Sequence, residues 1–135
     1  PGCGGGFFAR AARALNHLIG VADARRLTRQ QIVMFDLADL MAHVEVGAAV
    51  ARKAAALAAG GDPQAERAAL TARVFAWEAG QLFARNAMRV LTGTGDIEPE
   101  ALARSLAEIR FDEFAGGSPN VIRDMDRLAD IVFGR

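Results

Sequence analysis

The fold is decided by residues 28–61, which read TRQQIVMFDLADLMAHVEVGAAVARKAAALAAGG. Thr28 followed by Gln31 has the spacing of a capping box, which predicts the start of a helix. The pair Gly60-Gly61 predicts its end, because glycine adopts the left-handed C-cap conformation without strain. Between them, apolar residues recur every three or four positions, as on the buried face of a helix. These residues are Val33, Leu37, Leu40, Met41, Val44, Ala48, Ala51 and Ala55.

Similar signals place a helix on each side of this segment. Residues 7–19 form an amphipathic pattern that we expect to end at Gly20. Asp62-Pro63 predicts the start of a third helix, since aspartate can cap and proline at the first helical position loses no hydrogen bond. We expect this helix to run to residues 93–95, Gly-Thr-Gly.

Two more helices are predicted in the last third of the chain. Pro99 begins one that runs towards Phe114, and residues 116–117, Gly-Gly, interrupt the chain. Ser118-Pro119 repeats the signal of a cap followed by proline, so a last helix should follow it. The connections are short, which favours successive helices packed antiparallel.

The composition supports an all-α fold. The chain has 135 residues, of which 29 are alanine, the best helix former. Strand-favouring residues do not alternate over more than a few positions, so we expect no sheet. The predicted architecture is an antiparallel up-and-down helical bundle with two long central helices, forming one domain over residues 7–135. We expect residues 1–6, PGCGGG, to be a flexible linker or the cut end of a longer chain.

Charge and cysteine content exclude several classes of function. The chain carries 16 basic and 16 acidic residues, which argues against a nucleic-acid binder. Cys3 is the only cysteine, so no internal disulfide and no thiolate metal cluster can form. No apolar run approaches the roughly 20 residues that span a bilayer, and there is no signal-peptide pattern. The simplest expectation is a reducing compartment and a cytoplasmic protein.

The two histidines do not point to chemistry. His43 lies four residues after Asp39 on the long helix, but the Glu-x-x-His pairs of diiron bundles are absent. We therefore expect His43 to lie on a polar face or to form a helix-packing hydrogen bond. His17, near the predicted end of the first helix, should act as a cap or face solvent.

Other candidate groups also favour structural roles. Asp36 and Asp39 interrupt an apolar stretch and are expected to pair with arginines on a neighbouring helix. The available arginines are Arg73, Arg85, Arg89 and Arg123. The aromatic residues Phe75, Trp77 and Phe83 are expected in the core.

Two glycine motifs could suggest a phosphate site. Gly93-x-Gly95 follows a helix, whereas a dinucleotide loop must follow a strand. Residues 116–119, Gly-Gly-Ser-Pro, are better read as a turn between helices than as a phosphate cradle. We therefore predict no catalytic and no metal-binding residues, and the residues cannot identify a cofactor-binding set.

Three segments resemble those of one enzyme family, the acyl-CoA dehydrogenases. Residues 29–41, RQQIVMFDLADLM, are similar to the family's helix that begins near a glutamine and runs into Leu-Ala-Asp-Met. Residues 72–79, ARVFAWEA, resemble its Ala-Lys-Leu-Phe-Ala-Ser-Glu-Ala segment. Residues 87–95, AMRVLTGTG, resemble its Ala-Leu-Gln-Ile-Leu-Gly-Gly-Tyr-Gly. The resemblance spans about residues 25–134.

Two places in that family fit the chain. One is the catalytic C-terminal bundle, which usually ends in a Tyr-Glu-Gly-Thr-like loop whose glutamate abstracts a proton. The matching residues 114–118 read FAGGS, so Ala115 stands where the glutamate would be. The resemblance therefore implies the other place, the extra helical domain of large members such as the very-long-chain type.

The resemblance also implies a parent enzyme and its partners. Family members oxidise acyl-CoA to 2-enoyl-CoA with FAD, in fatty acid metabolism. We expect FAD in the parent enzyme and none in this chain, which would not be active alone. The implied partners are the catalytic core of the same polypeptide and a second subunit in a homodimer. Contact with a membrane surface gains little support from a net charge of zero.

Two other functions stay open on the residues alone. The chain could be a free-standing helical module that binds a partner helix through an apolar groove. It could also be a bundle that holds an acyl chain among its alanines, although small side chains equally allow close packing.

Overall fold

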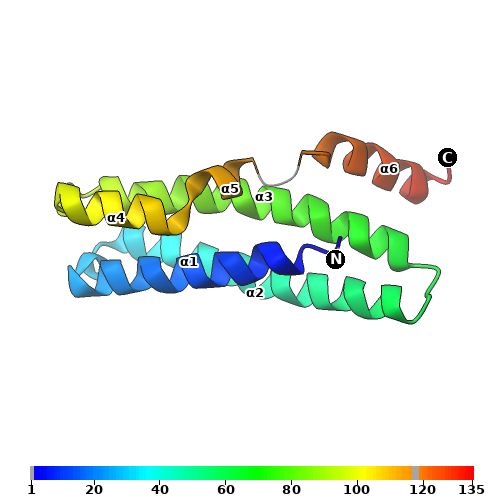
Figure 1. Cartoon of the computed structure of the whole chain (residues 1–135), viewed down its shortest axis with the longest axis horizontal. Helices are drawn as coiled ribbons and strands as arrows, with labels where there is room; N and C mark the ends of the chain where they lie inside the picture. The colour runs from blue at the N-terminus through cyan, green and yellow to red at the C-terminus, as the bar shows by residue number, and fades with distance from the viewer. Residues whose placement is uncertain (1, 117–118) are drawn as a thin grey trace.

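The structure is a computed structural model that describes residues 2–116 and 119–135. In this part of the chain every regular element is helical, which confirms the all-α fold (Figure 1). The elements are α1 (Gly5–Ala24), a 3-10 turn η1 (Leu27–Arg29), α2 (Gln31–Ala59), α3 (Ala65–Thr92), α4 (Pro99–Ile109), α5 (Phe111–Ala115) and α6 (Val121–Phe133).

The two long helices α2 and α3 form an antiparallel hairpin, as predicted. Gly60 follows the last residue of α2, and Gly61 takes the left-handed conformation with φ of 65°. The Asp62 carboxylate accepts a hydrogen bond from the Gln64 backbone N–H at 2.7 Å. Asp62 thus stabilises the turn before α3, and the helix itself begins at Ala65.

The first helix is longer than the sequence predicts. It begins at Gly5 and continues through Gly20 to Ala24, so the prediction that Gly20 ends it is wrong. Gly20 is exposed, and a Cβ there would meet no atom within 4 Å. Helix packing on both sides of this position therefore outweighs the low helix propensity of glycine. The expected linker over residues 1–6 does not hold for Gly5 and Gly6, and Cys3 is buried.

The start of α2 also differs from the prediction. Thr28 lies inside the 3-10 turn η1, and the residue before the helix is Gln30, whose side chain makes no capping bond. The capping box predicted at Thr28 and Gln31 is therefore wrong. Arg26, the residue just before η1, has φ of 55°, so the chain turns sharply between α1 and η1.

The predicted fourth helix is two helices, because the chain turns at Arg110. This residue has φ of 57°, in the left-handed region that interrupts a helix. α4 ends just before it and α5 begins just after it. The cap predicted at Ser118 lies outside the described residues, and α6 begins at Val121.

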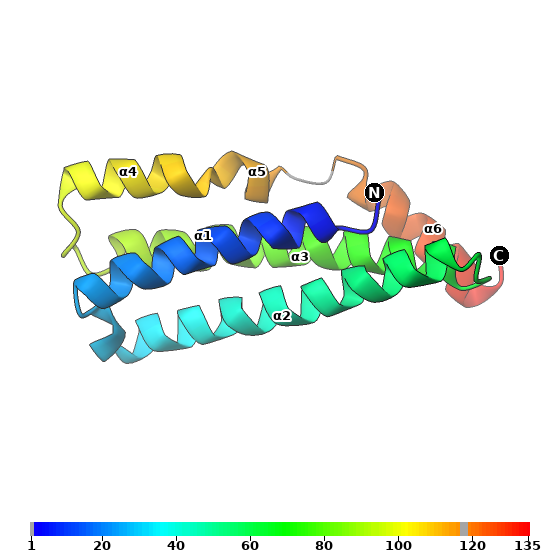
Figure 2. The same cartoon turned by 60° about the horizontal axis from the view of Figure 1, so that its bottom comes forward.

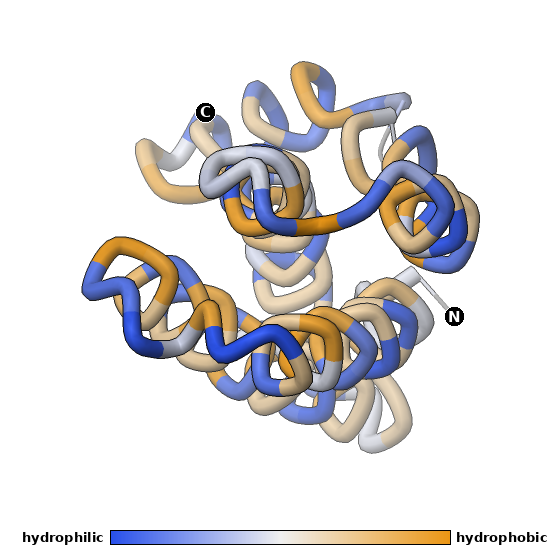
Figure 3. Tube along the Cα trace, turned by 90° about the vertical axis from the view of Figure 1, so that its left-hand side faces the viewer, coloured by the Kyte–Doolittle hydropathy of each residue, from blue (hydrophilic) through white to orange (hydrophobic). Residues whose placement is uncertain are grey.

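The helices form a bundle whose two ends differ. At one end α1, α2, α3 and α4 lie side by side, with α4 packed on α1 and α3 (Figures 1 and 2). At the other end α6 packs on α3, so α4, α5 and α6 together follow α3 as an interrupted antiparallel helix. Figure 3, which views the bundle end-on, shows apolar stretches at its periphery as well as between helices.

The core changes from large to small side chains along the bundle. Leucine, valine and phenylalanine fill the end that holds α4 and α5. Towards the α2–α3 turn the core narrows to small clusters such as Cys3, Ala54 and Ala72. The two predicted core residues Met41 and Ala55 are exposed. The buried stripe of α2 is therefore narrower than the sequence pattern indicates.

Candidate functional site

The position that the family resemblance assigns to a proton acceptor lies at the end of α5. Phe114 anchors this short helix, because its ring stacks on Phe83 with centroids 4.4 Å apart and meets Phe7 edge-on at 5.6 Å. The next residue, Ala115, is exposed. Its carbonyl oxygen accepts a hydrogen bond from the Gln81 side-chain amide at 2.9 Å. A methyl group therefore stands at this position, and it cannot accept a proton.

The close approach of α5 to α3 depends on Gly80. A Cβ at position 80 would stand 2.6 Å from the Phe114 carbonyl oxygen, closer than such atoms approach in proteins. Gly80 thus lets the backbone of α5 lie directly on α3. Neither Gly80 nor Gln81 was singled out from the sequence, because their roles depend on a contact with residues more than thirty positions away.

Of the two carboxylates on α5, that of Glu113 is held in ion pairs. Glu113 contacts Arg110 at 2.8 Å and Arg10 at 3.5 Å. These groups line a polar cavity of about 200 Å³ between α1 and the junction of α4 and α5, together with Arg13 and Glu108. The charges in this cavity largely compensate one another, which favours a role in holding α5 against α1.

His17 lies in the middle of α1 and not at its end. Its Nε2 lies 3.1 Å from the Ser105 hydroxyl oxygen on α4, so the expectation of a cap or a solvent-facing residue is wrong. The pair has the composition of a nucleophile and its base. Ser105 is only 1% exposed, however, so its hydroxyl cannot reach a substrate. The contact joins α1 to α4.

His43 has a structural role, but its hydrogen bond lies within α2 and its contact with α3 is ring stacking, not the predicted helix-packing hydrogen bond. Its Nδ1 lies 2.8 Å from the backbone carbonyl oxygen of Asp39, one turn earlier in α2. The imidazole stacks on the ring of Phe75 on α3 with centroids 5.9 Å apart. His43 therefore forms part of the packing between α2 and α3.

Asp36 forms the ion pair predicted for it. Its carboxylate is buried and accepts hydrogen bonds from Arg89 Nε at 2.7 Å and Arg89 Nη2 at 2.5 Å. The bound carboxylate raises the pKa of the Arg89 guanidinium above its ordinary value. The buried Asn86 donates a weaker hydrogen bond, 3.4 Å long, to the Asp36 carbonyl oxygen. Asp39 is exposed, and no ion pair links it to any described residue.

A second bidentate pair attaches α6 to α3. Arg73 donates from Nε and Nη2 to the two carboxylate oxygens of Asp124, at 2.8 and 2.7 Å. These bonds lower the pKa of Asp124 below its ordinary value despite its burial. Arg73 also donates from Nη1 to the Gly2 carbonyl oxygen at 3.1 Å. An exposed pair, Glu66 with Arg127, makes a second link to α6, and its hydrogen bonds lower the pKa of Glu66.

Two larger grooves lie on the surface of the bundle. One, about 490 Å³, lies beside the α2–α3 turn and carries Lys53, Arg67 and Asp62 on its rim. The other, about 480 Å³, lies between the start of α1 and α2 and is lined mainly by glycine and alanine. Its charged side chains are Glu45 and Arg52, which have opposite signs. Its lining thus offers little net positive charge for a diphosphate.

No group of three or more His, Cys, Asp or Glu side chains among the described residues could hold a metal ion. None of the helices in residues 2–116 and 119–135 has the length and apolar character to cross a bilayer.

The described residues define an all-helical class of protein. They form an antiparallel helical bundle in which several charged and polar side chains bond to one another across helices. The family model for the acyl-CoA dehydrogenase C-terminal domain matches residues 2–127. The chain therefore belongs to this family of domains. No curated protein and no solved structure matched the chain.

The family match extends further towards the N-terminus than the resemblance found in the sequence. That resemblance began at about residue 25, whereas the match includes all of α1. The difference has a physical basis, because α1 contains few distinctive side chains. Nine of its 20 residues are alanine or glycine, and its core residues include Phe8, Leu15 and Leu18.

Proposed function

We propose that the chain is the C-terminal helical domain of an acyl-CoA dehydrogenase-like flavoenzyme, and that this domain is itself non-catalytic. The parent enzyme would oxidise acyl-CoA to 2-enoyl-CoA with FAD. The domain would pack on the catalytic core and promote dimerisation. The observation that carries the non-catalytic role is Ala115, whose methyl group stands where the resemblance places a proton-abstracting glutamate.

The family to which the chain belongs implies FAD, but the described residues do not fit a complete flavin site. The methyl of Ala115 offers no base, and the nearby Glu113 carboxylate is bound by two arginines. The groove between α1 and α2 balances one acidic against one basic side chain. The proposal therefore assigns flavin binding and proton abstraction to other parts of the parent polypeptide.

The rival function is a free-standing interaction module, and the complete gene separates it from our proposal. The protein encoded by the whole reading frame should be purified and assayed for bound flavin and for acyl-CoA-dependent reduction of an electron acceptor. We expect a yellow, active enzyme, and a colourless, inactive preparation of the 135-residue chain alone. A gene product without flavin would contradict the parent activity. A 135-residue chain that bound FAD and oxidised acyl-CoA would contradict the non-catalytic role.

The role of position 115 is tested on the same full-length product. Ala115→Ser should leave the rate of acyl-CoA oxidation within about twofold, because a small exposed side chain replaces another away from the reacting atoms. A matched change is Ala107→Ser on α4, which is also exposed. A loss of more than about tenfold for Ala115→Ser alone would place this residue at the reaction centre.

A further inference from the structure

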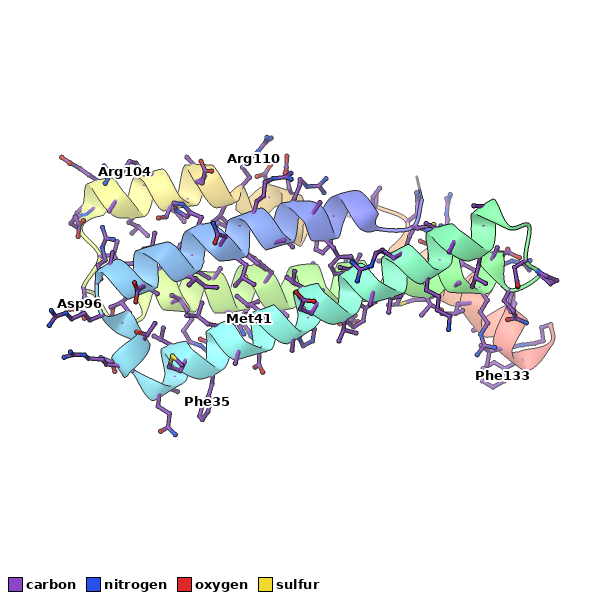
Figure 4. The ribbon with its side chains drawn as sticks, turned by 90° about the horizontal axis from the view of Figure 1, so that it is seen from below. Phe35, Met41, Asp96, Arg104, Arg110 and Phe133 are labelled. Carbon is purple, nitrogen blue, oxygen red and sulfur yellow. The ribbon has the colours of Figure 1, made fainter. Side chains whose placement is uncertain are left out.

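The last helix, α6, lies outside the apolar core. None of its side chains belongs to the three apolar clusters that form the core, whereas α4 and α5 contribute Ala101, Ile109 and Phe114. Of its seven large apolar side chains, Val121 is buried. Three are half-buried, Met125, Leu128 and Ile131, and three are exposed, Ile122, Val132 and Phe133. Figure 4 shows the Phe133 side chain pointing away from the bundle. Apolar burial therefore holds α6 less firmly than it holds the other helices.

The contact of α6 with α3 depends instead on two ion pairs. Asp124 of α6 pairs with Arg73, and Arg127, one turn further on, pairs with Glu66. The partners follow one another in opposite order along the two helices, so the pairs hold α6 antiparallel to α3 (Figures 1 and 2). The side chains of Glu66 and Arg127 are both more than half exposed, and exposed pairs contribute little stability. The partly buried, bidentate pair of Arg73 with Asp124 is therefore the principal attachment.

Arg73 also holds the start of the chain on α3. Its Nε and Nη2 donate to Asp124, and its Nη1 donates to the Gly2 carbonyl oxygen at 3.1 Å. Because the guanidinium group is planar and rigid, the carboxylate that binds two of its N–H groups also fixes the direction of the third. The next residue, Cys3, is buried in a small cluster whose other buried members are alanines of α2 and α3.

We infer that α6 is a latch, which leaves α3 as a unit while α1, α2 and α3 stay folded, and that Arg73 couples this release to that of the segment around Gly2. A helix of 13 residues is marginal in water on its own, so α6 unfolds once it leaves α3. Release therefore removes the hydrogen-bond protection of α6 and gives solvent access to the Cys3 thiol. This inference concerns the helical domain itself and does not depend on the activity of the parent enzyme.

Hydrogen exchange of the 135-residue chain tests the latch. Amide exchange should be measured at several urea concentrations below the unfolding transition. We expect the amides of residues 125–133 to exchange at least about 30-fold faster than the slowest amides of α2 and α3. Their rates should be similar to one another after correction for intrinsic exchange and should depend weakly on urea, because release exposes little surface. Exchange as slow as in α3, or rates that rise steadily towards residue 133 as in end fraying, would overturn the inference.

The substitution Arg73→Gln tests the attachment without changing the sequence of α6. We expect α6 to exchange at least about fivefold faster in this variant, because both bonds to Asp124 are lost. The matched control is Arg67→Gln, since Arg67 is exposed on α3 and forms no ion pair among the described residues. Continued protection in the centres of α2 and α3 confirms that each variant is folded. Equal rates in α6 for the two variants would show that Arg73 does not hold the latch.

The Cys3 thiol reports the coupling to the start of the chain. It is the only cysteine, so its reaction with an aromatic disulfide reagent gives a single rate. We expect Asp124→Asn to raise this rate at least about threefold, because Arg73 is then no longer fixed towards Gly2. The control is Asp126→Asn, since Asp126 is exposed on the same helix and in no ion pair among the described residues. A thiol rate that Asp124→Asn leaves unchanged would overturn the coupling.

Discussion

The ring of Phe8 on α1 lies directly against the bare backbone of Gly47 on α2. A Cβ at position 47 would overlap three atoms of this ring. Phe8 is 2% exposed and also contacts the rings of Phe7 and Phe75. The ring therefore cannot move aside without disturbing both neighbouring helices. This contact sets how closely α1 and α2 pack.

The first prediction concerns Gly47→Ala. Alanine gains about 1 kcal/mol of helix propensity over glycine, whereas overpacking a filled core costs about 1–3 kcal/mol or more. We expect the overlap with Phe8 to outweigh the gain and to lower the free energy of unfolding by about 1–2 kcal/mol. Urea denaturation followed by circular dichroism measures this change. In a Phe8→Leu background the same substitution should cost less, and an equal cost in both backgrounds would rule out the ring as its cause.

The second prediction concerns Gly20→Ala, which should stabilise the fold, whereas Gly47→Ala should destabilise it. Gly20 is exposed in the interior of α1, and a Cβ there meets no atom within 4 Å. The helix propensity then acts alone, so we expect stabilisation by about 0.5–1 kcal/mol. The measurement is the same urea titration. Destabilisation by this substitution would show that the chain breaks at residue 20, as the sequence pattern alone had suggested.

The sequence predicted the helices well because their apolar spacing and alanine content agree with each other. The turn at Gly60 and Gly61 was also predicted correctly, since several adjacent signals coincide there. The prediction that α1 ends at Gly20 is wrong, because one exposed glycine does not end a helix that is packed on both sides of it. The break at Arg110 carries no glycine or proline signal, so only the packing of α5 on α3 reveals it.

Some polar contacts could also be predicted from the sequence, and others could not. The pairing of Asp36 with an arginine could be predicted, because a carboxylate within an apolar stripe needs a partner. The contact of His17 with Ser105 could not, since it joins residues 88 positions apart. Met41 was expected in the core because periodicity on an alanine-rich helix does not show which of two apolar faces is covered.

The third prediction uses the ion pair of Asp36 with Arg89. Arg89→Met removes the partner and leaves a buried carboxylate uncompensated, so we expect a marked loss of stability. Replacing both groups, as Asp36→Leu/Arg89→Met, removes the buried charge as well. The double variant should therefore be more stable than Arg89→Met alone. Thermal unfolding of these two variants and of Asp36→Leu completes a double-mutant cycle. If the stability changes of the two single variants simply add up in the double variant, Asp36 and Arg89 are not directly coupled.

The fourth prediction is a pH dependence that arises from Asp124. Arg73 lowers the pKa of Asp124, so the pair stabilises the fold above about pH 4, where the unfolded carboxyl is also ionised. This contribution is lost as the pH falls through the lowered pKa. Asp124→Asn should therefore be less stable than the unchanged chain at neutral pH, with the difference shrinking towards about pH 2.

Urea unfolding at each pH can be followed by the fluorescence of Trp77, the only tryptophan, which lines a small cavity with Arg73. Asp126→Asn is the matched control, because Asp126 is exposed and in no ion pair among the described residues. A difference for Asp124→Asn that stayed constant with pH would contradict the charge origin of the contact.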